Sequence, residues 1–263
     1  MERGCVWIIG IGDVDKVAQL VAAQLKPYGL AVKGQKWPKG QSQAWVASAQ
    51  EAAAAAGHVV LVISTDADYH DPQTRRELAL FRLLLQSQLN RPVGGFVILT
   101  DASQSPLDPL FVNGTSILGD WEQVSGNQWP AKVVARLHAP RQLNWPFKLA
   151  LFTQEQLGVW LSVSPLPGHV MQGCLVGVNG TGCEINFHAV GTAGGLPEKS
   201  VNEYELRGLV FDVGSKSFDA WALQNMIGAD QAYYVRLVGE PDALAIGELP
   251  AGQLSEVDIV NLA

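Results

Sequence analysis

The stretch His58-Val59-Val60-Leu61-Val62-Ile63-Ser64-Thr65-Asp66 determines how the first half of the chain is expected to fold. Its unbroken apolar run is typical of a strand buried on both faces of a parallel sheet. A polar loop follows, and Asp71-Pro72 then supplies a helix cap and a first-turn proline. The helix that begins there carries Glu77. Ligands of parallel sheets sit beyond the carboxyl ends of the strands, so we expect Glu77 to lie at a ligand-binding edge.

Strand-like and helix-like patterns alternate on both sides of this stretch, up to residue 140. The alternation predicts βαβ units and therefore an α/β domain with a parallel sheet. Asp13 stands where it would cap the first helix, and Ser42 where it would cap the second. The predicted strands lie at 6–11, 30–33, 59–63, 95–100 and 116–118, and the predicted helices at 13–25, 42–57, 72–89 and 130–138.

The pattern changes beyond a proline-containing segment from Ala139 to Pro146, which we interpret as a linker. Short alternating apolar stretches then predict a β-rich antiparallel domain, either a small barrel or a sandwich. One helical turn is expected near Phe218 to Met226. The sequence thus predicts two domains, 1–140 and 147–263. The strands expected in the second domain lie at 148–152, 159–163, 174–178, 183–190, 205–213, 233–238 and 244–246.

Asn179-Gly180 predicts a hairpin turn between two of these strands. Strand alternation then places Cys174, Cys183 and Phe187 on one apolar face and His188 on the other. In that register the two cysteines do not face each other. We therefore interpret them as buried free thiols and predict no metal site.

The composition limits the classes of function. Of the 263 residues, 48% are hydrophobic and 16% are charged, as in a well-packed globular protein. The formal net charge of -7 argues against general binding to nucleic acid or anionic membranes, which relies on basic surface. No apolar run approaches the ~20 residues of a membrane span. The start of the chain has no signal-peptide pattern and the chain has three cysteines, so we expect a cytoplasmic protein with reduced thiols.

Three features of the first half occur in an order that is typical of one protein family. Acidic residues (Asp13, Asp15) come after the first strand, the apolar strand ends in Ser64, and the pair Glu77-Leu78 stands at the head of a helix. In this order they resemble a TIR (Toll/interleukin-1 receptor) domain, and the resemblance covers the first half only. It implies a flavodoxin-like, three-layer α/β fold. The Trp and Cys that usually precede the Glu-Leu pair are absent, since the chain reads Asp71-Pro72-Gln73-Thr74-Arg75-Arg76 there.

In enzymatic TIR domains the glutamate cleaves NAD, so the resemblance implies Glu77 as the catalytic residue. NAD, as a substrate and not as a prosthetic group, would contact Gly12, Asp13, Trp37 and Ser64. A carboxylate beside the ribose suits cleavage through an oxocarbenium-like state. Structural explanations stand beside these roles. Glu77 also suits the first turns of a helix, and Trp37 also suits packing of its loop onto the domain.

Two classes of function remain open. The first is a TIR-like adaptor that interacts with proteins in a bacterial-type conflict or signalling system, and the absent Trp-Cys pair favours it. The alternative is an NAD glycohydrolase or cyclase that uses Glu77 and is activated by self-assembly of the TIR-like domain. In both cases we expect the β-rich domain to recognise a protein partner, because it carries no nucleophile–base pair at a telling spacing. We predict that Trp221 and one tyrosine of the Tyr233-Tyr234 pair are exposed at that contact.

Overall fold

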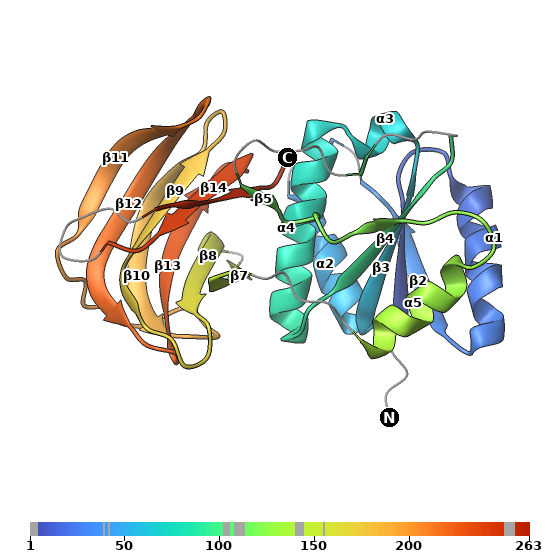
Figure 1. Cartoon of the computed structure of the whole chain (residues 1–263), viewed down its shortest axis with the longest axis horizontal. Helices are drawn as coiled ribbons and strands as arrows, with labels where there is room; N and C mark the ends of the chain where they lie inside the picture. Colours follow the sequence, from blue (N-terminus) through green and yellow to red (C-terminus); the bar gives the residue numbers. More distant parts are fainter. Residues whose placement is uncertain are drawn as a thin grey trace. The chain divides into compact units, whose positions relative to one another are not determined.

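The structure is a computed structural model that describes residues 5–38, 40–41, 43–101, 106–107, 114–139, 145–154, 156–249 and 256–263. The chain divides into two compact units (Figure 1). The first consists of Met1–Pro109 and Leu118–Leu143, and the second of Leu110–Ile117 and Asn144–Ala263. Residues 140–144, which form most of the predicted linker, lie outside the described residues.

The first unit is an α/β structure with a five-stranded sheet that is parallel throughout, which confirms the class predicted from the alternating pattern. Its elements are β1 (Cys5–Gly10), α1 (Asp15–Leu25), the 3₁₀ helix η1 (Lys26–Tyr28), β2 (Ala31–Lys36), α2 (Ala44–Ala54), β3 (Gly57–Ser64), α3 (Asp66–Tyr69), α4 (Pro72–Leu89), β4 (Gly94–Leu99), β6 (Glu122–Gln123) and α5 (Trp129–His138). The strands are hydrogen-bonded in the order β2-β1-β3-β4-β6. Figure 1 shows α1 and α5 on one face of this sheet and α2 and α4 on the other. Among the described residues, no helix combines the length and the apolar character that a membrane crossing requires.

The strand β3 lies at the centre of this unit, between β1 and β4. Val59, Leu61 and Ile63 belong to the apolar core that includes residues of α1 and α5. Val60 and Val62, which alternate with them and therefore face α2 and α4, are equally buried. Helices cover both faces of the sheet, and the unbroken apolar run is the sequence that such a position requires.

Three helix caps were predicted, and they differ in outcome. The Asp71 carboxylate accepts a hydrogen bond from the backbone N–H of Thr74 at 2.9 Å, so the cap of α4 is confirmed. The cap predicted at Asp13 is wrong. Helix α1 has Val14 at its N-cap position, so the exposed Asp13 lies one residue too early for its carboxylate to bond the free amides of the first turn. Ser42, the predicted cap of α2, lies outside the described residues.

The prediction of a fifth sheet strand at 116–118 is wrong. The strand β5 (Thr115–Ser116) pairs in parallel with β15 (Asp258–Asn261) of the second unit, and β6 takes the fifth position beside β4. A Cβ on Gly95 of β4 would lie 2.2 Å from the ring of Trp121, so glycine leaves the room that this indole needs. Trp121 therefore packs against β4 and brings the two residues after it into register. Strands of two residues give no periodic signal in a sequence.

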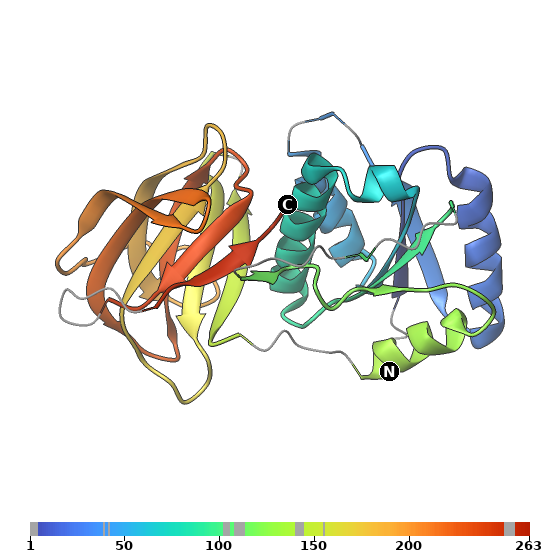
Figure 2. The same cartoon turned by 45° about the horizontal axis from the view of Figure 1, so that its top comes forward.

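The second unit is a β-sandwich. Its remaining strands are β7 (Phe147–Gln154), β8 (Gly158–Pro165), β9 (Met171–Asn179), β10 (Glu184–Thr192), β11 (Leu206–Val213), β12 (Lys216–Ile227), β13 (Gln231–Val238) and β14 (Ala243–Gly247). One sheet has the order β10-β13-β8-β7 and the other the order β11-β12-β9-β14-β15-β5. The two sheets face each other (Figure 2), since β10 contacts β9 and β12 across the core. All pairs are antiparallel except β15 with β5.

The helical turn expected near Phe218 to Met226 is wrong, because these residues lie in β12, between β11 and β9. Phe218, Ala220 and Ala222 alternate along one face of the strand, and all three are fully buried. Short apolar runs of this kind fit a helix or a strand equally well until their neighbours are known.

Asn179-Gly180 forms a turn, but the predicted hairpin is wrong. The strand β9 before it pairs with β12 and β14, while β10 after it pairs with β13 in the other sheet. The Asn179 side chain donates to Ser217 O at 2.8 Å, and Asn179 O accepts from Asp242 N at 2.8 Å. Ser217 lies in β12 and Asp242 directly precedes β14, and both strands belong to the sheet that contains β9. The turn therefore crosses from one sheet to the other.

Candidate functional site

Trp37 and Glu77, which are far apart in the sequence, meet in the first unit. The indole N–H of Trp37 donates to Glu77 Oε2 at 3.1 Å, and the side-chain amide of Gln73 donates to Glu77 Oε1 at 2.8 Å. Trp37 follows β2, and its backbone N–H donates to Gly10 O at the end of β1 at 2.7 Å. Its ring meets Phe81 of α4 edge-on, with centroids 5.7 Å apart. The loop after β2 is thereby attached both to the sheet and to α4.

The carboxylate of Glu77 is almost removed from solvent. Glu77 is 4% exposed and Trp37 is 3% exposed. A buried carboxylate needs donors for its oxygens, and each oxygen of Glu77 has one. Of the two donors, Trp37 is buried and Gln73 is exposed. The geometry gives the carboxylate a structural role, because it fixes α4 to the loop after β2.

The other residues predicted to contact NAD lie at the strand ends and do not join this pair. Gly12 follows β1 with φ of 81°, and a Cβ there would lie 2.8 Å from the Asp68 carboxylate. Ser64 ends β3 and is fully buried, and its Oγ has no hydrogen-bond partner among the described residues. Asp13 is exposed and caps no helix. The structure thus brings two of the five predicted site residues into contact.

Polar contacts hold the loop after β3 against the segment after β4. The Asp101 carboxylate accepts from Asp66 N, at 2.9 Å and 3.1 Å from its two oxygens. His70 Nδ1 lies 3.0 Å from Asp66 O, and His70 Nε2 lies 2.9 Å from Pro106 O. Contacts of the chain with itself therefore occupy this part of the carboxyl edge of the sheet.

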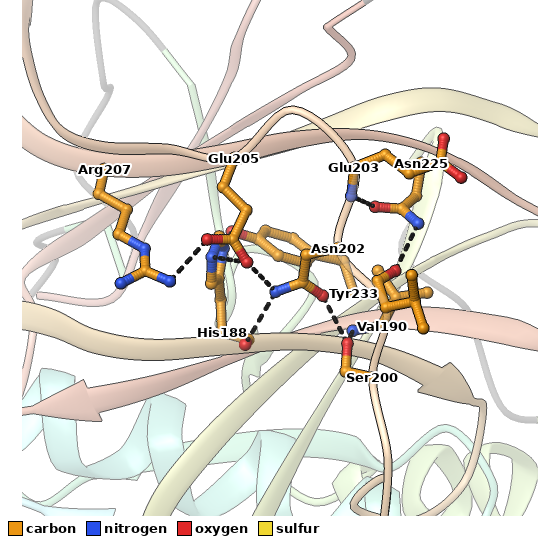
Figure 3. A network of polar contacts seen from close by, with 10 residues as sticks. His188, Val190, Ser200, Asn202, Glu203, Glu205, Arg207, Asn225 and Tyr233 are labelled. Atoms are coloured by element: carbon orange, nitrogen blue, oxygen red, sulfur yellow. Dashed lines mark hydrogen bonds and ion pairs between the residues drawn. The ribbon is translucent and has the colours of Figure 1, made fainter.

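A second concentration of polar side chains lies in the β-sandwich (Figure 3), and the sequence did not indicate it. His188 of β10 is 3% exposed, and its Nδ1 lies 2.8 Å from the hydroxyl of the fully buried Tyr233. His188 Nε2 lies 3.4 Å from Glu205 Oε1, which is a long contact and not a well-formed hydrogen bond. These three residues form a polar path from the core to a carboxylate near the surface.

The same network holds the segment between β10 and β11. Asn202 Nδ2 donates to Glu205 Oε1 at 2.6 Å and to His188 O at 3.4 Å. The Ser200 hydroxyl donates to Asn202 Oδ1 and accepts from Val190 N at 2.7 Å. Figure 3 shows these bonds passing from β10 into the segment. Ser200, Asn202 and Glu205 therefore tie the segment to a strand of the core.

Asn225 of β12 holds the other side of this segment (Figure 3). Its Oδ1 accepts from Glu203 N at 2.8 Å, and its Nδ2 donates to Val201 O at 2.9 Å. Gln224 N also donates to Glu203 O, at 2.9 Å. The backbone of the segment is thus bonded to β12 as well as to β10.

Four apolar side chains are exposed on and beside this segment: Val201 (80%), Tyr204 (78%), Met226 (69%) and Leu206 (40%). We refer to these four residues as the 204 surface. Tyr204 has φ of 47°, a left-handed conformation that residues other than glycine seldom adopt. A segment that is fixed by hydrogen bonds and holds apolar side chains in water is typical of an interaction surface.

Arg207 and Trp221 complete the network beside β11 and β12. Arg207 donates to Glu205 Oε2 at 2.6 Å, and its guanidinium lies 5.1 Å from the centre of the Trp221 ring. The ring of His188 meets Trp221 edge-on at 4.9 Å. Trp221 is half-buried between them. Its prediction as an exposed contact residue is therefore wrong, because the long side chain of Arg207 covers it.

Burial and neighbouring charges shift the pKa values in the network. Burial lowers the pKa of His188, while the charge of Glu205 raises it and that of Arg207 lowers it. The hydrogen bond from Asn202 lowers the pKa of Glu205. Burial raises the pKa of Tyr233. At neutral pH the network therefore contains a neutral imidazole, an ionised carboxylate and a protonated phenol.

A β-bulge in β10 places His188 on the buried face, which the sequence had assigned to Phe187. The pairing of β10 with β13 shifts between Ile185 and Phe187, so Asn186 is an extra residue. After it the alternation is reversed, and Phe187 is 49% exposed while His188 faces Tyr233. Apart from this asparagine, a residue type that is depleted in strands, nothing in the sequence marks the bulge.

The prediction that one tyrosine of the Tyr233-Tyr234 pair is exposed is wrong, because both are fully buried. Tyr234 packs with Phe152 and Leu196 on the side of β13 away from His188. Its hydroxyl donates to Thr192 O at 2.6 Å. The segment after β10 covers Tyr234 with Leu196, and strand alternation alone does not reveal this contact.

Comparison with protein-family models, with curated proteins and with solved structures finds no match to this chain. In the part of the chain that the structure describes, no three His, Cys, Asp or Glu side chains are grouped as metal ligands. Cys5 and Cys174 are buried and Cys183 is half-buried, and none of these three described cysteines forms a disulfide. The function of this chain therefore has to be argued from the Trp37–Glu77 contact and from the network around His188.

We predict that Glu77→Gln lowers the free energy of unfolding of the first unit by about 1–3 kcal/mol. Glu77 accepts from two donors, and a glutamine would turn its own NH₂ group toward one of them. Chemical denaturation followed by circular dichroism measures the effect. Glu51→Gln on the exposed side of α2 is the matched control and should change the free energy by less than about 0.5 kcal/mol. Equal stability of both variants would contradict the structural role of Glu77.

We predict that the β-sandwich loses stability as the pH falls below the ordinary His188 pKa of 6.5. Burial lowers the pKa of His188 in the folded protein. As the pH falls, the unfolded state therefore takes up a proton first, and the β-sandwich loses stability until the pH reaches the folded-state pKa of His188. The slope contributed by His188 is at most about 1.4 kcal/mol per pH unit. Unfolding of wild type and His188→Gln between about pH 8 and about pH 5 should show a smaller slope in the variant. His169→Gln, at an exposed histidine of the same unit, should keep the wild-type slope.

Proposed function

We propose that this chain is an interaction module of a bacterial-type conflict or signalling system. In this proposal a TIR-like, flavodoxin-like α/β unit acts as an adaptor without NAD chemistry, and the β-sandwich unit binds a protein partner. The observation that carries the proposal is the 204 surface, where apolar side chains stand in water on a segment that is bonded to two strands.

The 204 surface has the chemistry of a protein contact. Its exposed side chains are one aromatic ring, Tyr204, and three aliphatic groups, and the charged pair Glu205 and Arg207 follows Tyr204 closely in the sequence. Apolar anchors inside a polar rim are the usual anatomy of an interface. Because hydrogen bonds already order the segment, little conformational entropy is lost when a partner binds.

The Trp37–Glu77 contact supports an adaptor over an enzyme in the α/β unit. Both oxygens of the carboxylate already accept hydrogen bonds from the protein. The absence of the Trp-Cys pair before Glu77-Leu78 also supports an adaptor over an enzyme. The strand order β2-β1-β3-β4-β6 supports the flavodoxin-like arrangement that the resemblance implies.

One observation favours the alternative, an enzyme that cleaves NAD with Glu77. The chain brings Trp37 and Glu77 together, and these are two of the residues that the TIR resemblance places around NAD. Gln73 is exposed, so its amide can move away from Oε1 of the carboxylate. In this alternative NAD is a substrate, Trp37 orients the carboxylate, and self-assembly of the α/β unit activates the enzyme.

The cytoplasm is the compartment that we propose. Three cysteines without a disulfide among them fit a reducing environment. The net charge of -7 disfavours nucleic acid and anionic membrane as partners. A protein is therefore the partner class that the 204 surface and the overall charge support together.

We predict that Tyr204→Asn weakens capture of the protein partner by about tenfold or more, because an aromatic anchor at an interface centre carries a large share of the binding free energy. Asparagine tolerates the left-handed backbone of this position, so the segment keeps its shape. The measurement is affinity capture from a lysate of the source cells by the immobilised full chain, followed by titration of the captured protein.

Tyr28→Asn is the matched control, since Tyr28 is 49% exposed in η1 of the first unit. It should bind the partner as wild type does. Loss of capture in both variants, or in neither, would contradict the assignment of the contact to the 204 surface. Thermal unfolding of the two variants checks that each is folded.

A further inference from the structure

The strand β11 is an edge of the six-stranded sheet in the β-sandwich. One side of its backbone pairs with β12, and no strand among the described residues pairs with its other side. Val210, at the middle of the strand, is 74% exposed, and Leu209 and Phe211 beside it are half-buried. An edge strand presents a row of backbone N–H and C=O groups to which another strand can bond. An apolar, exposed edge strand is therefore a candidate for pairing with a second chain.

Two other edge strands of the chain are protected against such pairing. At the edge of β10, the side chains of Ser200 and Asn202 bond to backbone groups of the strand. The edge strand β2 carries Lys33 and Lys36, and lysines on an edge discourage pairing. From Leu206 to Val213, β11 contains neither lysine nor proline. The edge at β11 thus lacks the protection that β10 and β2 have.

The exposed side chains Arg207, Val210 and Asp212 lie on one face of β11. Val210 pairs with Asp219 of β12, and the guanidinium of Arg207 lies 5.1 Å from the centre of the Trp221 ring, also in β12. Asp219 and Trp221 are two residues apart and therefore share a face. A shift in the pairing of β11 with β12, before residue 209, accounts for the three-residue spacing between Arg207 and Val210. Asp212 follows Val210 by two residues and shares its face.

Antiparallel pairing of two β11 strands about a two-fold axis at Val210 matches these side chains. Residues that oppose each other in such a pair share a face. Val210 then faces Val210 of the second copy, Leu209 faces its Phe211, and Arg207 at the bulge lies opposite its Asp212. Because of the two-fold symmetry, the apolar pair and the charged pair each occur twice.

Other registers of this pairing fit less well. A shift by one residue would bring together side chains from opposite faces of the sheet. A two-fold axis at Phe211 would place Val210 opposite Asp212 and would separate Asp212 from Arg207. The sequence of the strand therefore favours the axis at Val210.

The side chain of Arg207 can bond a second carboxylate. It is 57% exposed, and it donates to Glu205 Oε2 at 2.6 Å. A guanidinium has five N–H donors, so this bond leaves others for Asp212 of the second copy. The contact with Glu205 also holds the guanidinium near the edge of the sheet.

We propose that two copies of this chain form a symmetric dimer through β11, in antiparallel register about Val210. The dimer joins the two six-stranded sheets into one continuous sheet. The evidence for a second copy as the occupant is the match of the strand to itself, with apolar residues opposite apolar residues and Arg207 opposite Asp212. The dimer requires no other protein, so it stands whether or not the 204 surface binds a partner.

Sedimentation velocity of the purified full chain, from about 5 μM to about 200 μM, tests for the dimer. We expect a reversible dimer with a dissociation constant of about 100 μM or lower. Val210→Lys places like charges opposite each other at the axis and should raise the dissociation constant about tenfold or more. Val170→Lys is the matched control, because Val170 is 52% exposed in the same unit and lies outside β11. It should dimerise as wild type does.

Cysteine cross-linking tests the register. Opposed Cα atoms of an antiparallel pair lie about 5 Å apart, which is within the range of a disulfide. Val210→Cys should therefore cross-link to itself under mild oxidation, even where the dimer is weak. Val170→Cys and the wild type, which has three cysteines of its own, give the background.

Three results would each overturn the proposal. The first is a wild type that stays monomeric over the whole concentration range. The second is a dimer that Val210→Lys leaves unchanged, and the third is cross-linking of Val210→Cys at the level of Val170→Cys. Both positions are exposed, and circular dichroism checks that each variant is folded.

Discussion

The role that we propose for the first unit depends on one interaction, the hydrogen bond from Trp37 to Glu77. It joins the loop after β2 to helix α4 and gives a donor to a carboxylate that is 4% exposed. Burying an ionised group without donors is costly, so the indole and the carboxylate require each other. Because donors of the chain itself hold this carboxylate, we propose that the α/β unit is a scaffold.

A buried polar side chain also organises the β-sandwich, where its contacts reach a surface segment. His188 is buried with Tyr233 at 2.8 Å on one side, and its contacts lead through Glu205 and Asn202 into the segment that carries Tyr204. The polar contacts around this core residue therefore also hold a surface segment. We expect loss of stability in acid from the neutral, buried imidazole, and the contacts of His188 are one of the links that hold the segment of the 204 surface.

The sequence predicts those features of the fold that follow from local residue patterns. The apolar run of β3, the Asp71 cap of α4 and the parallel α/β class follow from local rules, and so does the change to short strands in the second half. Features that depend on how a single residue packs in the folded protein cannot be predicted from these local rules. Asn186 reverses the alternation of β10, Gly95 makes room for Trp121 beside β4, and the turn at Asn179 joins two sheets. Trp37 and Glu77 could each be selected as candidates, but the sequence does not reveal that they bond to each other.

We propose that Glu77 holds the α/β unit together and does not cleave NAD. The most direct measurement is the release of nicotinamide from NAD by the full chain, both in dilute solution and under crowding that promotes assembly. The account predicts no release above the buffer background in either condition. Release by the wild type that falls about a hundredfold or more in Glu77→Gln would contradict it and would assign catalysis to this carboxylate.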